Sequence, residues 1–261
     1  MGFRLIWPAA HEDPVVTQQR DNFYFYMAWA LAIAVFVGFA PTFYLGASFD
    51  LPRLHLEGME QRPSRPLEHM HGFIATLWMA LFIAQTGFVR STKISRHRML
   101  GIAGMVLGVI LVVQIVVLMF QTASDRNAAG ILDEPFVTLT NRLFWGNVVM
   151  VVPIAVLMTF GYLNRRNRHI HRRLMLLLML CLLPATVGRI ARFELPGLPM
   201  AAVSFLILLG FLSAPVIHDY ITRQRVHPLY LIGCPAILLL TLLAAFLLPQ
   251  LNFVRTVVAL L

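Results

Sequence analysis

The sequence predicts an all-α protein, a polytopic membrane bundle of about seven transmembrane helices. Of its 261 residues, 59% are hydrophobic and only 13% are charged, whereas a typical soluble domain has about 25% charged residues. The apolar residues fall into seven runs, each close to the roughly 20 residues that a helix needs to cross a bilayer. Because lipid offers the backbone no hydrogen-bond partner, helices are the expected form of these runs.

The seven runs define the elements in order and leave two short ends. The predicted spans are residues 23–45, 71–89, 100–120, 144–163, 174–190, 200–217 and 229–248. Together they form a transmembrane domain, 23–248, between an N-terminal segment, 1–22, and a C-terminal tail, 249–261. Five prolines lie in or near the spans, and we expect them to kink helices rather than end them. These prolines are Pro41, Pro153, Pro184, Pro215 and Pro235.

The segments between spans predict the orientation of the chain. "VRSTKISRHR", "NRRNRHIHRR" and "ITRQR" follow the second, fourth and sixth spans and hold four, five and two basic residues. With Arg4 and Arg20, one side of the membrane carries thirteen basic residues and the other carries eight. The positive-inside rule then places the N-terminus in the cytoplasm and the C-terminus outside.

Composition and motifs also exclude several classes of function. The net charge of +9 comes from clusters between apolar runs, which fits topology control and contact with lipid headgroups, so no nucleic-acid partner is expected. Cys181 and Cys234 lie inside apolar runs and form no CxxC pattern, which indicates packing residues. The chain has no Walker A, HExxH, GxSxG or CxxCH motif. No acidic residue stands in the middle of a span, which argues against a proton-coupled transporter.

Histidines gather where helices begin on the predicted cytoplasmic side. His97, His171 and His227 each precede an apolar run by a few residues, and Asp219 closes the sixth span. Neutral imidazole ligates iron, copper and zinc, and two histidines at equal depth can hold a haem axially. One interpretation is that His97 and His171 bind haem b or a transition metal, with His227 and Asp219 completing a metal site. The other is that all are interfacial anchors.

A second group of polar residues is expected at the outer face. His71, Trp78 and Gln85 are spaced by seven and so form one stripe along the second span. The stripe should face the bundle, because glutamine in lipid is unfavourable. His69 and Arg189 lie at the same face. The group is either a polar contact between helices or the lining of a cavity for a small polar or quinone-like ligand, and both interpretations remain open.

Several of these stretches resemble the signatures of an uncharacterised bacterial family of seven-span integral membrane proteins. They are "HMHGFIATLW", "QTGFVRSTKISRHRMLG", "HRRLMLLLMLCLLPATVGR" and "HDYITRQRVHP". The resemblance runs from about residue 23 to residue 235 and implies the fold and a location in the bacterial inner membrane.

The chain is also distantly similar to cytochrome b561-type and ferric-reductase-type bundles, which carry histidine pairs at both membrane faces. The inner pair of that pattern would be His97 with His171. The outer pair is incomplete, because the span opposite His71 offers only Asn141 and Asn147. This similarity therefore implies at most one bis-histidine haem.

Two classes of function follow from these observations. One is a haem- or metal-binding redox protein of the membrane, with a quinone or another redox protein as its partner. The other is a non-enzymatic membrane protein, such as a permease, sensor or assembly factor, in which the histidines only anchor helix ends. In both, the lipid bilayer is the surrounding medium.

Overall fold

The structure is a computed structural model that describes residues 22–45, 66–128, 136–192 and 197–251. Within these ranges most residues are helical and none is in a strand, and seven helical segments are long and apolar enough to cross a membrane. The predicted all-α bundle with seven candidate transmembrane helices is therefore confirmed. Most of the predicted end segments, 1–22 and 249–261, lies outside the described residues.

The helices extend beyond the apolar runs or divide within them. The first span consists of α1, Phe23–Phe39, and a π-helical turn η1, Ala40–Tyr44. The next three are α2, Pro66–Arg90, α3, Ile94–Ala128, and α4, Phe136–Leu163. The fifth span divides into α5, Arg168–Leu180, and α6, Leu183–Ile190. The last two are α7, Met200–Arg223, and α8, Pro228–Leu242, which continues into η2, Leu243–Leu247, and η3, Leu248–Gln250.

Prolines behave in two ways in this bundle. Pro153, Pro215 and Pro235 lie inside α4, α7 and α8, and the helices continue through them as predicted. Pro184 lies in the first turn of α6, directly after the break at the end of α5. A proline at that position has no unsatisfied N–H, so it starts the new helix well. The fifth span is therefore two helices rather than one kinked helix.

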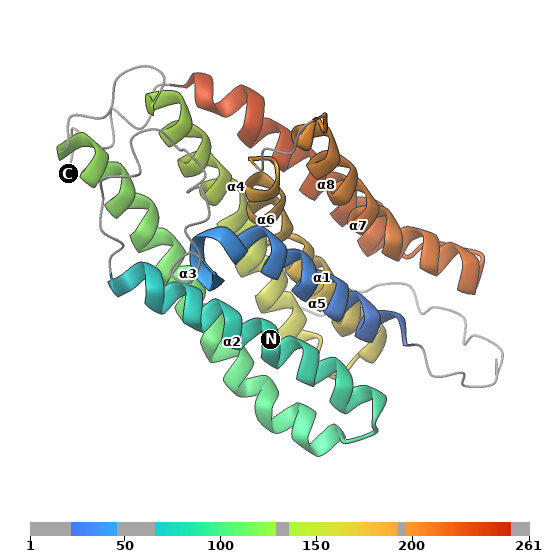
Figure 1. The fold of residues 1–261 in the computed structure, drawn as a ribbon. Coiled ribbons are helices and arrows are strands. Elements are labelled where there is room, and N and C mark those ends of the chain that lie inside the picture. Colours follow the sequence, from blue (N-terminus) through green and yellow to red (C-terminus); the bar gives the residue numbers. More distant parts are fainter. Residues whose placement is uncertain (1–21, 46–65, 129–135, 193–196, 252–261) are drawn as a thin grey trace, which may run out of the picture.

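The fifth span is the centre of the bundle. Helix α5 packs against α4 and α8, and α6 packs against α1 and α7, as Figure 1 shows. Leu176–Leu180 are all buried, whereas α2 and α3 form a hairpin on one flank with many apolar side chains exposed. The exposed leucine, isoleucine, valine and phenylalanine side chains of the outer helices are what a lipid-facing surface requires.

Close helix contact is visible between α1 and α6. A Cβ added to Gly38 would lie 2.9 Å from the main-chain oxygen of Thr186. The backbones can approach this closely only because residue 38 is glycine. This contact holds the first span against the centre of the bundle.

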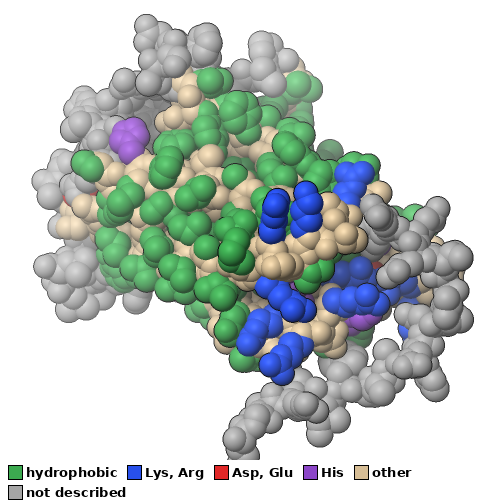
Figure 2. Space-filling model, turned by 90° about the horizontal axis from the view of Figure 1, so that it is seen from below, with side chains coloured by type: hydrophobic (Ala, Val, Ile, Leu, Met, Phe, Trp, Pro, Cys, Tyr) green, Lys and Arg blue, Asp and Glu red, His purple; other side chains and the backbone are tan. Residues whose placement is uncertain are grey.

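The two ends of the bundle differ in charge. The turns α2–α3, α4–α5 and α7–α8 lie at one end, which we call the basic end, and Figure 2 shows lysine and arginine gathered there beside a broad apolar flank. The basic residues of these turns and the adjoining helix ends are Arg90, Lys93, Arg96, Arg98, Arg165, Arg166, Arg168, Arg172, Arg223 and Arg225. We call the opposite end, where α2 begins and α6 ends, the far end.

Candidate functional site

Two histidines meet at the basic end. His97 lies in the first turn of α3 and His171 in the first turn of α5. Their ring centroids are 6.1 Å apart, and the ring planes are nearly perpendicular at 81°. The start of α5 is fixed by Asn167, whose side chain accepts hydrogen bonds from the main-chain N–H groups of His169 and Ile170. Such a cap sets where the first turn begins and hence where His171 points.

The surroundings of this pair determine which ring nitrogen is available. Nδ1 of His171 lies 2.8 Å from the carbonyl oxygen of Gly161 on α4. A carbonyl only accepts, so Nδ1 carries the proton and Nε2 keeps a free lone pair. Nδ1 of His97 is buried and has no hydrogen-bond partner among the described residues, nor has the buried side-chain amide of Gln85. The main chain of Gln85 lies close to the His97 ring, so α2 borders the histidine pair.

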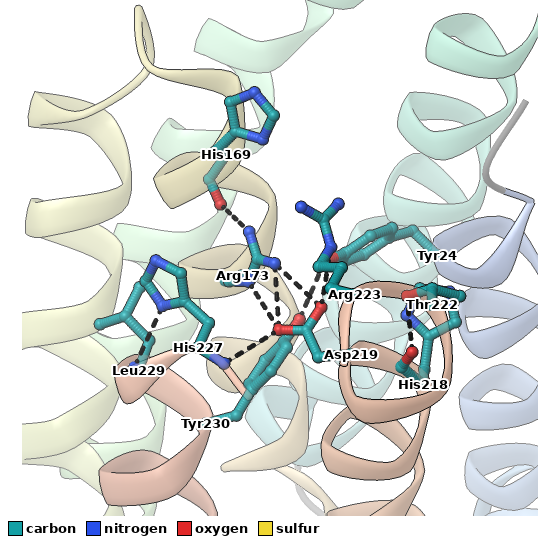
Figure 3. A network of polar contacts seen from close by, with 10 residues as sticks. All are labelled: Tyr24, His169, Arg173, His218, Asp219, Thr222, Arg223, His227, Leu229 and Tyr230. Carbon is teal, nitrogen blue, oxygen red and sulfur yellow. Dashed lines mark hydrogen bonds and ion pairs between the residues drawn. The ribbon is translucent and has the colours of Figure 1, made fainter. Parts of the chain in front are cut away.

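A second polar network lies at the same end, between α5, α7 and α8 (Figure 3). The guanidinium of Arg173 donates to Asp219 at 2.9–3.2 Å, and it also donates to the main-chain oxygen of His169 at 2.8 Å. Arg173 and Asp219 are only 1% and 0% exposed. Arg223, one turn after Asp219, approaches the same carboxylate at 3.4 Å. The network ties the start of the central span to the end of α7.

His227 belongs to this second network. Its main-chain N–H donates to Asp219 at 3.3 Å, and its ring Nδ1 accepts from the N–H of Leu229 at 3.2 Å, which caps α8. Burial, with Arg173 adding to it, lowers the pKa of His227 to about 4. The imidazole is therefore neutral near pH 7 and can serve as a capping acceptor.

Two tyrosines complete the network on the side toward the core. The hydroxyls of Tyr24 on α1 and Tyr230 on α8 are 3.1 Å apart. The guanidinium carbon of Arg173 lies 5.7 Å from the ring centroid of Tyr230, which is fully buried. Aromatic faces stabilise a cation in such a position. The positive charge of Arg173 is thus neutralised by the Asp219 carboxylate on one side and covered by the Tyr230 ring on the other.

The structure divides the four predicted ligands into two pairs. His97 and His171 are brought together, whereas His227 and Asp219 lie in the Arg173 network. Across the described part of the chain, no group of three or more His, Cys, Asp or Glu side chains is placed to hold a metal ion. The arrangement at the basic end is therefore one two-imidazole site beside one ion-pair network.

The predicted stripe on α2 faces α3. Nε1 of Trp78 donates to the main-chain oxygen of Gly104 at 2.9 Å. His71 lies beside Gln114 of α3 near the far end, and Gln85 lies beside His97 at the basic end. Because α2 and α3 are antiparallel neighbours, the stripe places one polar group toward each end of their contact and one in the middle.

The remaining predicted residues lie around the far end. The Arg189 guanidinium donates to the main-chain oxygen of Ala185 at 3.0 Å and lies 4.0 Å from the ring centroid of Phe39. His69 is exposed, with its ring 6.5 Å from that of Phe43. Thus Arg189 is held against the bundle near His71.

Sequence reasoning missed Arg173 and Gln114. Arg173 was counted only among the charges that set orientation, although it directly precedes an apolar run. Gln114 is the one amide within the predicted span 100–120, and a polar residue in mid-span is a signal of interior contact.

Comparisons of the chain with protein-family models, with curated proteins and with solved structures find no match.

Proposed function

We propose that this multi-pass membrane protein is a b-type haem protein in which His97 and His171 are the two axial ligands. The observation that carries the proposal is the pairing of their rings at the basic end, 6.1 Å between centroids. Two imidazoles bound to one iron through bonds of about 2 Å each place their centroids roughly 6 Å apart. The measured separation agrees with that requirement.

The number of available ligands favours haem over a bare ion. Zinc and copper ions in proteins take about four ligands, most of them His, Cys, Asp or Glu. Only two such side chains meet in this site among the described residues. A porphyrin supplies four nitrogens itself and needs only two from the protein. A two-imidazole site therefore suits haem b better than an isolated transition metal.

The hydrogen bond from His171 to Gly161 supports the same proposal. A metal-bound histidine usually donates its other ring N–H to a carbonyl or carboxylate, which fixes the tautomer and the ring orientation. Nδ1 of His171 has such a carbonyl at 2.8 Å. Nε2 is then the nitrogen presented to iron, which in such proteins supplies one-electron transfer.

The proposal includes a location. The basic end faces the cytoplasm of a bacterium, because basic turns stay on the cytoplasmic side of the inner membrane. The haem at His97 and His171 would then exchange electrons near the cytoplasmic surface. The resemblance to seven-span bacterial membrane proteins agrees with this location. The redox partner is a quinone or another redox protein.

The test is haem content per chain in the detergent-purified protein, with and without added haemin. Wild type is expected to bind about one haem, while His97→Ala and His171→Ala each lose most of it. His169→Ala is the matched control, since it lies on α5 two residues before His171 but its ring is exposed. It should bind as wild type does.

Two outcomes contradict the proposal. One is a wild type that stays colourless with and without haemin, and the other is equal haem binding by all three variants. Either result makes the His97–His171 contact a packing interaction at a wet helix end. The alternative class, a permease, sensor or assembly factor, then becomes the better account.

A further inference from the structure

A buried amide lies beside a histidine at the far end. Gln114 lies on α3 with 5% of its surface exposed. Neither its side-chain nitrogen nor its side-chain oxygen has a hydrogen-bond partner among the described residues. Nδ1 of His71, on the neighbouring helix α2, is also buried without one. The two side chains lie within reach of each other, and one hydrogen bond between them would still leave one polar atom of the Gln114 amide without a partner.

Such a cluster needs a partner from outside the protein. A buried polar group without a hydrogen bond destabilises a fold by roughly 1–3 kcal/mol, and lipid provides no substitute. Of the buried polar groups in α3, Gln114 alone stands in a run that is otherwise apolar on both sides, from Val106 to Phe120. A leucine at position 114 would avoid this penalty, so the amide points to a bound ligand.

The surroundings of His71 and Gln114 indicate the chemistry of that ligand. An amide and an imidazole can each donate and accept, so the pair suits a group that exists as a carbonyl and as a hydroxyl. Arg189 lies near His71 and adds a cation that favours electron-rich oxygen atoms.

The neighbouring side chains also suit a flat ring. The ring of Phe43 packs directly over Gly72, the residue after His71, in a position that any Cβ would block. Phe39 lies under the Arg189 guanidinium at 4.0 Å. Aromatic faces of this kind stack with planar ligands.

The position in the bundle limits the route of access. His71 lies five residues into α2, which places it about 7–8 Å along the helix from its start. Phe73 and Leu77 of the same helix are exposed on the apolar flank. A ligand with a long apolar tail can reach this depth from the lipid and leave its tail there.

We propose that His71 and Gln114 bind the headgroup of a lipid-soluble quinone, with its carbonyl or hydroxyl oxygens at the imidazole and the amide. Arg189 adds an electrostatic attraction from α6. The site is at the opposite end from the His97–His171 pair, so it stands independently of the proposed haem.

The test uses decylubiquinone as the probe and decylbenzene as the control for partitioning into detergent. Bound quinone per chain is measured after gel filtration across a range of probe concentrations. Wild type should saturate near one per chain. His71→Phe and Gln114→Leu should each weaken binding about tenfold, the effect of losing one hydrogen bond at a buried site. Decylbenzene should not compete.

Thr241→Val is the matched control. It also replaces a polar group by a methyl within a span, but its hydroxyl is satisfied by the oxygen of Ile237 in its own helix. It should bind the probe as wild type does. Of the two site variants, whichever elutes as a single folded species is sufficient for the test.

The proposal is overturned if wild type shows no saturable binding, or if the site variants bind the probe as tightly as Thr241→Val. Water alone then satisfies Gln114. Haem content of the same preparations separates the two proposals. Gln114→Leu should keep the haem of wild type, and loss of haem in His97→Ala should leave quinone binding intact.

Discussion

At the residue scale, the Arg173–Asp219 ion pair is almost completely buried. Both side chains are almost fully removed from solvent, and three guanidinium–carboxylate contacts of 2.9–3.2 Å join them. A buried pair of this kind contributes little relative to apolar residues of the same shape, but breaking it leaves an uncompensated charge. The ion pair fixes the position of the start of α5 relative to the end of α7.

Asp219→Asn should therefore destabilise the protein strongly. The neutral amide leaves the Arg173 charge buried without a counterion, which costs about 3–5 kcal/mol. Thermal unfolding in detergent measures the effect. Arg223→Gln is the control, since Arg223 approaches the same carboxylate from a partly exposed position and exposed pairs contribute at most about 1 kcal/mol.

A double variant makes this prediction sharper. Arg173→Met combined with Asp219→Leu removes both charges, so it should unfold at a higher temperature than Asp219→Asn alone. If Asp219→Asn instead unfolds at the same temperature as wild type, the ion pair does not hold α5 and α7 together.

The sequence did not predict the roles of the individual residues at the basic end. Nothing in the spacing of His97, His171 and His227 distinguishes a ligand from a capping residue, because all three precede apolar runs. His227 differs by the proline that follows it, which starts α8 and makes residue 227 the cap. The partner of Arg173 is 46 residues away, and the packing of α8 against both α5 and α7 brings the two residues together.

At the element scale, α8 depends on the protonation state of its cap. The N–H of Leu229 is accepted by Nδ1 of His227, and protonation removes that acceptor. Burial lowers the pKa of His227 to about 4, against about 6.5 in an unfolded chain. Arg173, Arg223, Asp219 and His169 also act on the ring.

Stability should then fall on acidification in a defined range. Between about pH 6.5 and pH 4 the unfolded chain binds a proton that the folded chain does not, so the His227 contribution is full above 6.5 and is lost toward 4. His227→Asn keeps a capping oxygen and removes the titration. Wild type and His227→Asn should unfold at similar temperatures near pH 7.5, and wild type should fall progressively below the variant toward pH 4.5. A constant difference between them would contradict this role.

The spans were predictable because their apolar runs match the bilayer in length. Their ends were less so, since helices α2, α3 and α4 extend into polar sequence beyond the runs 71–89, 100–120 and 144–163. Such extensions add backbone hydrogen bonds without adding hydrophobicity. The break after α5 was also missed, because Pro184 is compatible either with a kink or with a new helix.

At the scale of the whole molecule, the three basic turns share one end of the bundle (Figure 1), and lysine and arginine gather there (Figure 2). The orientation proposed from this asymmetry is tested by reporter fusions. Fusions after residues 95, 168 and 222 should behave as cytoplasmic, and fusions after 60, 130 and 195 as periplasmic. Green fluorescent protein and alkaline phosphatase give opposite readouts at each position. The reversed pattern would place the histidine pair outside the cell.

The whole bundle also places the two proposed sites at opposite ends of one helix hairpin. Gln85 and His97 lie near the basic end, His71 and Gln114 near the far end, and the Trp78–Gly104 hydrogen bond lies between them. The sequence predicted the stripe on α2 from its spacing of seven. It did not predict that α3 supplies Gln114, because the register between two helices is set by their packing.

The central claim is that His97 and His171 bind one iron from its two sides, and the visible spectrum of the haem-loaded protein tests it most directly. Wild type should show the Soret and visible bands of a six-coordinate low-spin haem. The small amount of haem that His97→Ala and His171→Ala retain should show a five-coordinate high-spin spectrum, and added imidazole should restore the low-spin bands. A low-spin spectrum that is unchanged in both variants would show that other residues hold the haem and would contradict the account.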